Sequence, residues 1–597
     1  MKLELRSSMA WLLCYFTAGL PCATAEVRVE VCPQFAGRPL VYDNTALTNS
    51  AGQNLSVTRM DLLLSEFEFQ REDGTIVELD QECALIRARD QRTTFNLRIF
   101  PGKYRRLRFT VGLPPELNHA DPARFDADHV LNPRVNGLHW SWQGGYVFLA
   151  LEGNWIRADS VVSGYSFHLA TDGQTAVIDL PLDLEVRTNA RVGLILDVTK
   201  LLPTSLTDDA SSTHSRPGDP CADELRRRLQ SAFRCELKAD GAELTSHDQG
   251  NRDTLRHADT AADATPFRFT YPAWFPQPAL PRDNPLTEEG VELGRRLFEE
   301  PLLSINGRQS CASCHEPTSG FTDRGRRFSV GAEGKEGIRN SMPLMNLAWK
   351  ASFFWDGRAP SLREQVLMPI ENALEMHESL SNVVQKLRAA DKEAKTTSYR
   401  LRFARAFGSG EVTPERITRA LEQFVITQTS YDSKFDRVLG GAAELTDEEK
   451  RGFELFHAEY DPRRGLYGAD CFHCHGGPLF QSQTFANNGL DARFADSGRM
   501  EVTRQPGDRG KFAVPSLRNV EVTAPYMHDG RFATLEQVVE HYSAGVQRSA
   551  TLDPNLAKHP DGGVPMTSAD KKALVSFLKT LTDERYRAAA VVANSPR

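Results

Sequence analysis

The sequence predicts a multidomain protein in which an all-β sandwich or barrel precedes two mainly α-helical modules. Its 597 residues exceed what a single hydrophobic core usually organises. Segments of strand-like alternation dominate the first third of the chain, whereas helical patterns that occur twice begin near residue 286. We therefore divide the chain into five parts, at 1–25, 26–245, 246–285, 286–444 and 445–590.

The composition is that of an ordinary globular protein, with 40% apolar and 25% charged residues. The formal net charge of −8 provides no basic surface for nucleic acid, so we expect no nucleic-acid partner.

Residues 1–25 are predicted to be a signal peptide. Lys2 and Arg6 precede an apolar run, and Ala23-Thr24-Ala25 has the small residues of a cleavage site. No later apolar run approaches the length of a membrane-spanning helix. We expect a mature chain that begins near Glu26, is exported to the periplasm and does not span the membrane.

Residues 26–245 are expected to form the β domain. Strand-like segments separated by Gly, Pro, Asn and Asp occur at 27–31, 63–69, 106–111 and 192–198. The polar stretch 205–220 is typical of an exposed loop, and 221–235 indicates a short basic helix.

Four cysteines lie in this domain, and an exported chain permits disulfides. The natural pairs are Cys32–Cys83 and Cys221–Cys235, although the sequence leaves other connectivities open. Residues 246–285, rich first in His, Asp and Thr and then in Pro, are predicted to be an extended linker that buries little apolar surface.

The helical half contains one pattern twice, at an offset of roughly 160 residues. Gly294-Arg-Arg-Leu-Phe298 and Gly452-Phe-Glu-Leu-Phe456 open the two copies, the second after a capping box of Thr446 and Glu449. The later matches follow in the same order in each copy: Arg339-Asn340 with Arg518-Asn519, then Trp355-Asp-Gly-Arg358 with His528-Asp-Gly-Arg531. We infer that one module was duplicated.

Each copy carries a Cys-x-x-Cys-His motif, Cys311-Ala-Ser-Cys314-His315 and Cys471-Phe-His-Cys474-His475. A zinc site would require the two pairs to converge, although each lies in its own repeat, and a redox pair would not use the following His. The motifs therefore predict two covalent c-type hemes, with His315 and His475 as iron ligands, in two cytochrome c-like heme modules. His473, inside the second motif, is expected to be a surface residue.

With these motifs in place, residues 286–585 resemble the bacterial diheme cytochrome c peroxidase and MauG family, in which one heme reacts with peroxide and the other stores or relays an electron. The resemblance is carried by Ser310–His315, Gly320–Asp323, Phe354–Arg358, Val514–Asn519 and Thr523–Gly530.

The resemblance implies roles for individual residues. Tyr542 would be the second axial ligand opposite His475, where peroxidases of this family usually have Met and MauG-like enzymes Tyr. The alternative is a buried aromatic residue. Gln365 and Glu375 match the catalytic distal pair, with Glu375 as acid–base group, and the alternative for Glu375 is a solvated helix face.

No His occurs between His315 and His377, so we expect an open face at the first heme. Met368 is a conceivable ligand there but is more typical of a core residue. Trp355 corresponds to the tryptophan that couples the two hemes. Asn340, with the carbonyls of Thr523 and Pro525, matches a calcium site between the hemes.

The front domain, over about residues 27–240, resembles the MbnP family of exported copper-binding β proteins through His139–Tyr146, Phe148–Gly153 and Phe167–Leu169. In that family a tryptophan is oxidised to kynurenine by a MauG-like diheme partner and forms a copper(I) site with histidines. The resemblance implies His139 and His168 as copper ligands.

Trp140 or Trp142 would then be the oxidisable ring of this copper site. Gln174 stands near a position where relatives often carry Cys. The alternative interpretation is that the tryptophans are core aromatics and His139 is a hydrogen-bonded surface residue.

Three functions follow from these observations. In the first, the enzyme uses hydrogen peroxide to oxidise a tryptophan of its own copper-binding domain. In the second, a diheme peroxidase reduces peroxide with electrons from a small redox protein, against which Tyr542 and the missing distal His argue. In the third, the chain binds copper or transfers electrons without turnover, against which Gln365 and Glu375 argue.

Overall fold

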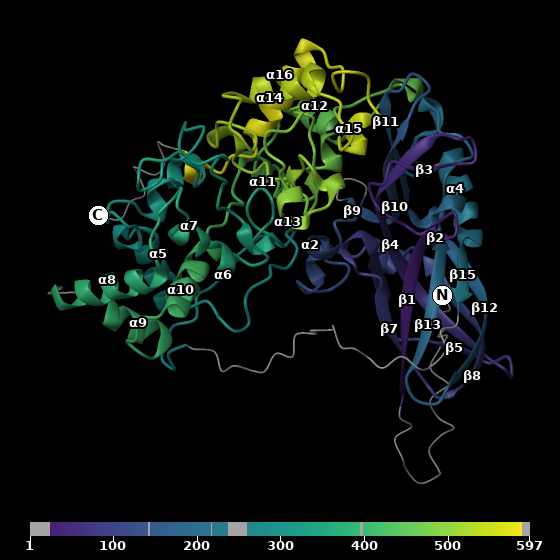
Figure 1. The fold of residues 1–597 in the computed structure, drawn as a ribbon, viewed down its shortest axis with the longest axis horizontal. Helices are drawn as coiled ribbons and strands as arrows, with labels where there is room; N and C mark the ends of the chain where they lie inside the picture. Colours follow the sequence, from purple (N-terminus) through teal and green to yellow (C-terminus); the bar gives the residue numbers. More distant parts are fainter. Residues whose placement is uncertain (1–23, 141–143, 217, 237–259, 394–397, 588–597) are drawn as a thin grey trace, which may run out of the picture.

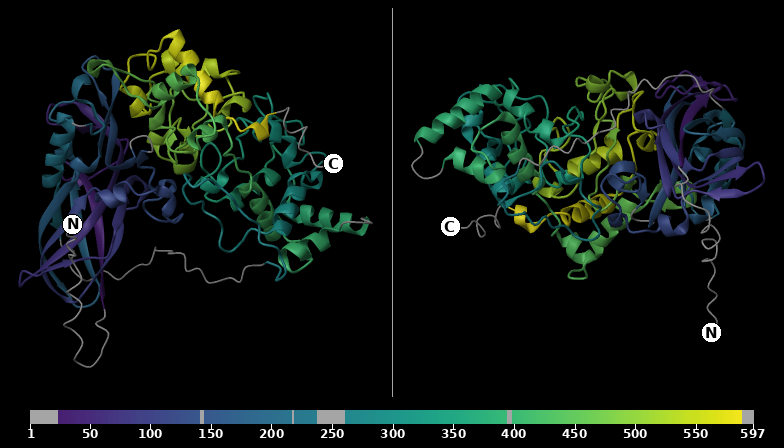
Figure 2. Two further views of the ribbon diagram at one scale, coloured as in Figure 1. Left: turned by 180° about the vertical axis from the view of Figure 1, so that it is seen from behind. Right: turned by 90° about the horizontal axis from the view of Figure 1, so that it is seen from below.

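The computed structural model describes residues 24–140, 144–216, 218–236, 260–393 and 398–587. A β domain lies at one end of the molecule, and the second helical module lies between this domain and the first helical module (Figures 1 and 2). The order of β-rich and helical parts confirms the predicted fold class. Among the described residues, no helix is long and apolar enough to cross a membrane.

The smaller sheet of the β domain has five strands and is organised around β1. β13 runs parallel to β1 along most of its length, and β7 and β2 pair with the beginning and the end of β1. The strands are β1 (Ala25–Phe35), β2 (Arg38–Pro39), β7 (Thr94–Ile99), β13 (Ala190–Asp197) and β15 (Phe233–Glu236).

The larger sheet has ten strands and follows the order β12-β8-β4-β10-β11-β14. These strands are β4 (Asn54–Arg71), β8 (Gly102–Val111), β10 (Gly145–Ile156), β11 (Val162–Ala170), β12 (Ala176–Val186) and β14 (Ser212–Thr213). Four short strands complete the sheet: β3 (Leu47–Thr48), β5 (Ile76–Glu78), β6 (Cys83–Arg87) and β9 (His139–Trp140).

The two sheets share one hydrophobic core, which makes this domain a β-sandwich. Val29 of β1, Leu64 of β4 and Ile178 of β12 are fully buried in it. The helix α4 (Pro220–Ala232) covers part of this core through Leu225 and Leu229, as expected for the basic segment at 221–235. Three short helices lie in the loops: α1 (Pro115–Asn118), α2 (Pro133–Asn136) and α3 (Val198–Leu201).

Neither expected cysteine pair is joined by a disulfide in the described residues. Cys32 lies on β1 of the smaller sheet, whereas Cys83 lies on β6 of the larger sheet and is buried among apolar side chains. Cys221 lies in the first turn of α4, whereas Cys235 lies on β15, beyond the end of that helix, so about 16 Å of helix at a rise of 1.5 Å per residue runs between them. The secondary structure therefore separates the members of each pair.

Within its described residues, the first helical module contains six helices. They are α5 (Glu288–Phe298), α6 (Leu362–Gln365), α7 (Met368–Glu371), α8 (Leu380–Glu393), α9 (Tyr399–Phe407) and α10 (Pro414–Ile426). The next helix, α11 (Lys434–Leu439), precedes residue 445, yet Phe435 packs into the core of the second module. Conversely, Tyr586 packs into the core of the first module, so the two modules interlock.

The second module is built from five helices and a π-helical turn at His541–Gly545. The helices are α12 (Asp447–His457), α13 (Met500–Thr503), α14 (Leu535–Glu540), α15 (Pro554–Ala557) and α16 (Ser568–Lys579). Four short strands, β16 (Tyr460–Asp461), β17 (Leu466–Tyr467), β18 (Phe485–Ala486) and β19 (Phe512–Ala513), pair in its loops.

The predicted repeat is visible as two equivalent helix pairs, α5 with α10 and α12 with α16. A Cβ atom on Gly294 would lie 1.9 Å from the carbonyl oxygen of Ala420, and one on Gly452 would lie 2.0 Å from that of Ala573. Only glycine permits this approach of two helix backbones. Thr446 and Glu449 form the predicted capping box at the start of α12.

The Pro-rich segment before α5 is more buried than the sequence indicated. Phe275 is fully buried in the core of the first module, and Phe267, Phe269 and Tyr271 pack against that core. The Nε1–H group of Trp349 donates a hydrogen bond of 2.6 Å to the carbonyl of Pro276. The aromatic residues between the prolines provide the apolar surface that the linker interpretation overlooked.

The β domain is docked on the second module along β10 and β11. Asn154 donates to the carbonyl of Leu552 (3.1 Å), and Arg548 donates to the carbonyl of Val162 (2.6 Å). At Gly164 of β11 a Cβ atom would lie 2.0 Å from the carbonyl of Pro554, the first residue of α15. The two backbones therefore touch, and this contact positions the sites described next.

Candidate functional sites

The first heme motif opens into a cavity of about 480 Å³. Cys311, Cys314 and His315 line it, and neither thiol takes part in a disulfide. His315 Nδ1 lies 2.6 Å from the carbonyl oxygen of Phe321, to which it donates in the tautomer that leaves Nε2 for iron. The residues therefore fit a covalently attached heme with His315 as its axial ligand.

Gln365 and Glu375 line the same cavity as His315. The Glu375 carboxylate accepts a hydrogen bond of 2.7 Å from Asn372 Nδ2, next to the end of α7. Burial raises the pKa of Glu375 above its ordinary value. A carboxyl group of this kind can exchange a proton with a ligand in the cavity.

Among the described residues that line this cavity, His315 is the only histidine, which fits the expectation of an open heme face. Met368 does not line the cavity and packs against the core of the first module.

Trp355 lies at the boundary between the two modules and also lines the cavity. Its Nε1–H donates to the carbonyl oxygen of Asn340 (2.8 Å), and its own carbonyl accepts from the backbone N–H of Ala513 in the second module (2.7 Å).

The Asn340 amide donates to the carbonyls of Arg326 and Arg327, at 3.2 and 3.1 Å. Calcium at Asn340, Thr523 and Pro525 stays a prediction.

The second heme motif borders a smaller cavity, which it shares with the β domain. His475 Nδ1 lies 3.2 Å from the carbonyl oxygens of both Phe480 and Pro515, so Nε2 is again the nitrogen left for iron. Tyr542 lies in the π-helical turn, and its hydroxyl accepts a hydrogen bond of 3.4 Å from Asn488 Nδ2. Burial raises the pKa of Tyr542 above its ordinary value. Cys471 and Cys474, whose thiols are in no disulfide, complete a set that fits a second heme.

The small cavity at the domain junction brings Trp140 and His168 of the β domain together with His473 and Cys474 of the second heme motif. The ring centroids of Trp140 and His168 lie 5.5 Å apart. His139 lines this cavity as well, but its ring packs edge-on against Tyr146 at 4.7 Å. Trp142 lies outside the described residues.

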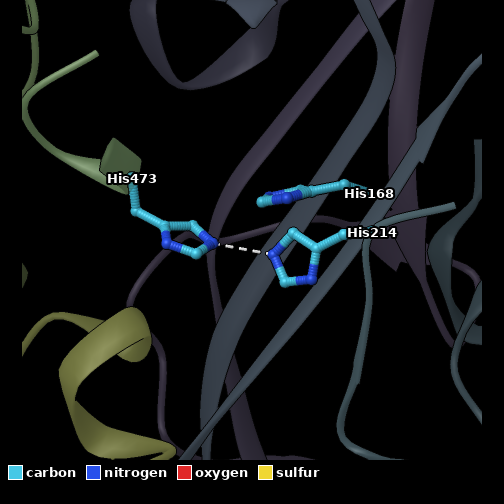
Figure 3. A group of neighbouring side chains, drawn as sticks. All are labelled: His168, His214 and His473. Carbon is cyan, nitrogen blue, oxygen red and sulfur yellow. Dashed lines mark hydrogen bonds between the residues drawn. The ribbon is translucent and has the colours of Figure 1, made fainter. Parts of the chain in front are cut away.

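His473 is not a surface residue, because the docked β domain covers it. Its side chain is 2% exposed, and its Nε2 lies 2.7 Å from Nε2 of His214 (Figure 3). His214 lies in the stretch predicted to be an exposed loop, yet the short strand β14 pairs with β11 and draws the histidine beneath the surface, where it is 3% exposed. Burial of this stretch depends on strand pairing and docking, which residue types alone do not indicate.

Each of the three histidines also has an acidic neighbour. Glu152 Oε1 lies 2.9 Å from Nε2 of His168, and Glu459 Oε1 lies 2.6 Å from Nδ1 of His214. Asp470 Oδ1 lies 3.6 Å from Nδ1 of His473.

These acidic neighbours stay charged, whereas His168 and His473 are neutral. Although burial opposes it, the neighbouring His214 lowers the pKa of Glu459 to about 2. Burial lowers the pKa of His168 to about 4 and that of His473 well below its ordinary value. These two rings are therefore neutral near pH 7 and keep a lone pair for a metal.

Gln174 and Trp155 lie away from this junction. Gln174 donates to Asp223 at 3.0 Å, and Trp155 is 5% exposed within the sandwich core.

Each half of the chain matches a known protein family. Residues 288–444 match the family model of the di-haem cytochrome c peroxidases, and residues 24–216 match the MbnP model. A methylamine utilization protein MauG of Methylorubrum extorquens is 36% identical over 53% of this chain and 84% of its own length. A cytochrome c551 peroxidase of Nitrosomonas europaea is 37% identical over 51% of this chain and 82% of its own.

Among solved structures, a MauG-like protein associated with microbial copper homeostasis is 35% identical. The alignment covers 54% of this chain and 97% of that one, with a TM-score of 0.48.

Proposed function

Because the chain belongs to the di-haem cytochrome c peroxidase and MauG family and has an MbnP domain in front, we propose that this peroxide-dependent diheme oxidoreductase oxidises Trp140 of its own β domain. The observation that carries the proposal is the position of that ring. Trp140 lies 5.8 Å from the ring of His214, which contacts His473 between the two cysteines of the second heme motif.

When bound, the two hemes would supply oxidising equivalents drawn from peroxide. Glu375 would take the proton from the oxygen of peroxide that binds and deliver it to the oxygen that leaves, with Gln365 holding the peroxide beside it. Trp355, which is hydrogen-bonded to both modules, would connect the first site to the second. Tyr542 would provide a hard, anionic ligand to the second heme.

The oxidation balances with peroxide as the sole oxidant. Cleavage of the indole ring of Trp140 adds two oxygen atoms, consumes two molecules of hydrogen peroxide and releases two of water. Hydrolysis of the resulting N-formylkynurenine gives kynurenine and formate. We place this chemistry in the periplasm, where the N-terminal signal would direct the chain, and link it to copper binding by the MbnP domain.

Peptide mass spectrometry before and after peroxide treatment of the diheme protein tests the proposal. We expect two covalent hemes, and after peroxide a peptide in which Trp140 has gained two oxygen atoms or has become kynurenine. Trp155 is the matched control, since its ring is buried in the sandwich core and should stay unmodified. An unmodified Trp140, or modification at Trp142 instead, would refute the assignment.

A second candidate function is reduction of peroxide with electrons from a small redox protein, which is favoured by the 37% identity to a cytochrome c551 peroxidase. Rapid turnover of a reduced cytochrome donor by a protein whose tryptophans stay intact would establish that function.

A further inference from the structure

One positively charged side chain in the first heme cavity has no acidic neighbour. Lys350 lines the cavity into which the first heme motif opens, and it is half-buried there. Burial lowers the pKa of its ammonium group to about 8, and no charged or hydrogen-bonding group of the described residues adds to or opposes this shift. The group is therefore still charged near pH 7, and a buried charge without a partner is costly.

The acidic side chains that line this cavity already have partners. Asp356 lies 2.6 Å from Arg339 and 3.1 Å from Arg358. Glu501 lies 3.6 Å from Arg339, and Glu375 accepts the amide hydrogen bond described above. Among the described residues of the cavity lining, these are the three acids. Lys350 is therefore the cation of this lining that is left without a carboxylate.

The backbone at Lys350 is fixed by all three parts of the molecule. The preceding Trp349 is fully buried in the first module and hydrogen-bonded through its indole nitrogen. The carbonyl of Lys350 accepts a hydrogen bond of 3.4 Å from Arg134 of the β domain. The backbone N–H of the next residue donates to Gln483 of the second module at 3.0 Å. The origin of the lysine side chain is thus well defined.

Lys350 also lies close to the second heme motif. Pro515 of the second module lines the same cavity, and its carbonyl oxygen lies 3.2 Å from Nδ1 of His475. Burial lowers the pKa of the His475 ring to about 4, and the charge of Lys350 adds to this effect. The ammonium group therefore lies on the side of the first cavity that faces the second module.

We propose that Lys350 is a positioning residue that binds a propionate carboxylate of the first heme, on the side of that heme facing the second module. A c-type heme is attached through its vinyl groups and keeps its propionates, so it brings carboxylates into this cavity. A hydrogen bond between ammonium and carboxylate is of the strong, charge-assisted kind, and it would supply the partner that Lys350 lacks. This role concerns a heme that the family carries and does not rest on the oxidation of Trp140.

The charge of Lys350 should also affect the reduction potential of the first heme. Positive charge near an iron stabilises its reduced state, and a carboxylate left without its cation does the opposite. Removal of the ammonium group should therefore lower the potential. The second heme should respond in the same direction but less, because the carboxylate in question belongs to the first.

A redox titration of the diheme protein tests this role. Absorption and electron paramagnetic resonance would follow the two hemes separately. In Lys350→Met we expect the equilibrium for one-electron reduction of the first heme to shift about tenfold toward the ferric state, which is a fall of about 59 mV. The resonance Raman bands of the heme propionates should change in the same variant.

Two further variants separate this role from a merely structural one. Lys350→Arg keeps the charge and should keep the potential and the propionate bands close to those of the natural chain. Lys335→Met removes an equal charge from an exposed lysine in a loop that borders the same cavity, and it should change neither readout. Heme content is measured first, and if Lys350→Met retains fewer than two hemes, the polar Lys350→Gln replaces it.

An unchanged first-heme potential in a fully loaded Lys350→Met or Lys350→Gln protein would overturn the proposal. A shift confined to the second heme would overturn the assignment to the first. A potential of the natural chain that depends on added acetate would show that a free carboxylate occupies the site, and would overturn the heme as its source. An unmodified Trp140 in a protein whose potentials respond as expected would refute the proposed function alone.

Discussion

The two heme modules share a scaffold and differ in what surrounds the heme. Both pack a glycine-bearing helix, α5 or α12, against a second helix at backbone contact, and both anchor Nδ1 of the heme histidine on carbonyl oxygens. The first module opens into a cavity of about 480 Å³ lined by Gln365 and Glu375. The second encloses Tyr542 and presents His473 to the β domain.

This difference shows how two copies of one duplicated module can take on different functions. The helix pair and the motif hold the cofactor in both copies, so they cannot distinguish the modules. The surroundings of the two heme motifs differ. The first module has the carboxyl group of Glu375 and an open cavity, whereas the second has the phenol of Tyr542 and the neighbouring β domain. We expect the first module to receive the small oxidant and the second to face the protein substrate.

The largest effect is expected from Glu375→Gln, which removes the acid–base group of the open module. Peroxide consumption should fall by about 10²–10⁴-fold. Burial raises the pKa of Glu375, and the ionised carboxylate is the base. As the pH falls, the activity of the natural chain should therefore begin to decline at a higher pH than it would with an ordinary glutamate. Stopped-flow measurement of the rate against pH should show this limb only in the natural chain.

The exposed Glu371 provides the matched control, since Glu371→Gln lies in α7 close by and should keep both rate and pH profile. A Glu375→Gln enzyme with an unaltered rate would show that the two modules do not differ in the way we infer.

A smaller effect is expected at the close helix contact that both modules share. Gly294→Ala and Gly452→Ala each drive a methyl group against a helix carbonyl, and each should lower the free energy of unfolding by about 2–3 kcal/mol. Denaturant titration of both variants checks this. In Gly440→Ala the added methyl meets neighbours only at ordinary van der Waals distance, so stability should hold. Unequal losses at Gly294 and Gly452 would contradict the equivalence of the helix pairs.

The smallest effect is expected from Tyr542→Phe, which alters the enclosed module alone. Loss of the phenol oxygen should change the absorption spectrum of the second heme and lower the yield of modified Trp140 about tenfold. Tyr526→Phe removes a phenol oxygen that bonds to the carbonyl of Val520 in the same module and should leave the spectrum as it was. An unchanged spectrum in Tyr542→Phe would contradict the prediction that Tyr542 is a ligand of the second heme.

The sequence was sufficient for the fold class and for the two heme motifs, because covalent heme attachment needs a contiguous motif and strands need alternation. It misjudged His473 and the stretch around His214 because their burial depends on a neighbouring domain. The pairing of His139 with His168 followed from the resemblance to the MbnP family, yet His139 packs on Tyr146. The expected disulfides are absent among the described residues, because Cys32 and Cys83 lie on different sheets and α4 runs between Cys221 and Cys235, which the sequence does not show.

The backbone contact between Gly164 and Pro554 has a kinetic consequence. A ring held against the second module by the fold does not have to diffuse to it, so its oxidation would be first order in protein, and at a fixed peroxide concentration its half-life would not depend on how dilute the protein is. Each chain would carry one such ring and use it once. On this view the peroxide chemistry is a step of self-maturation, completed when every molecule has processed itself, rather than a cycle measured in turnovers.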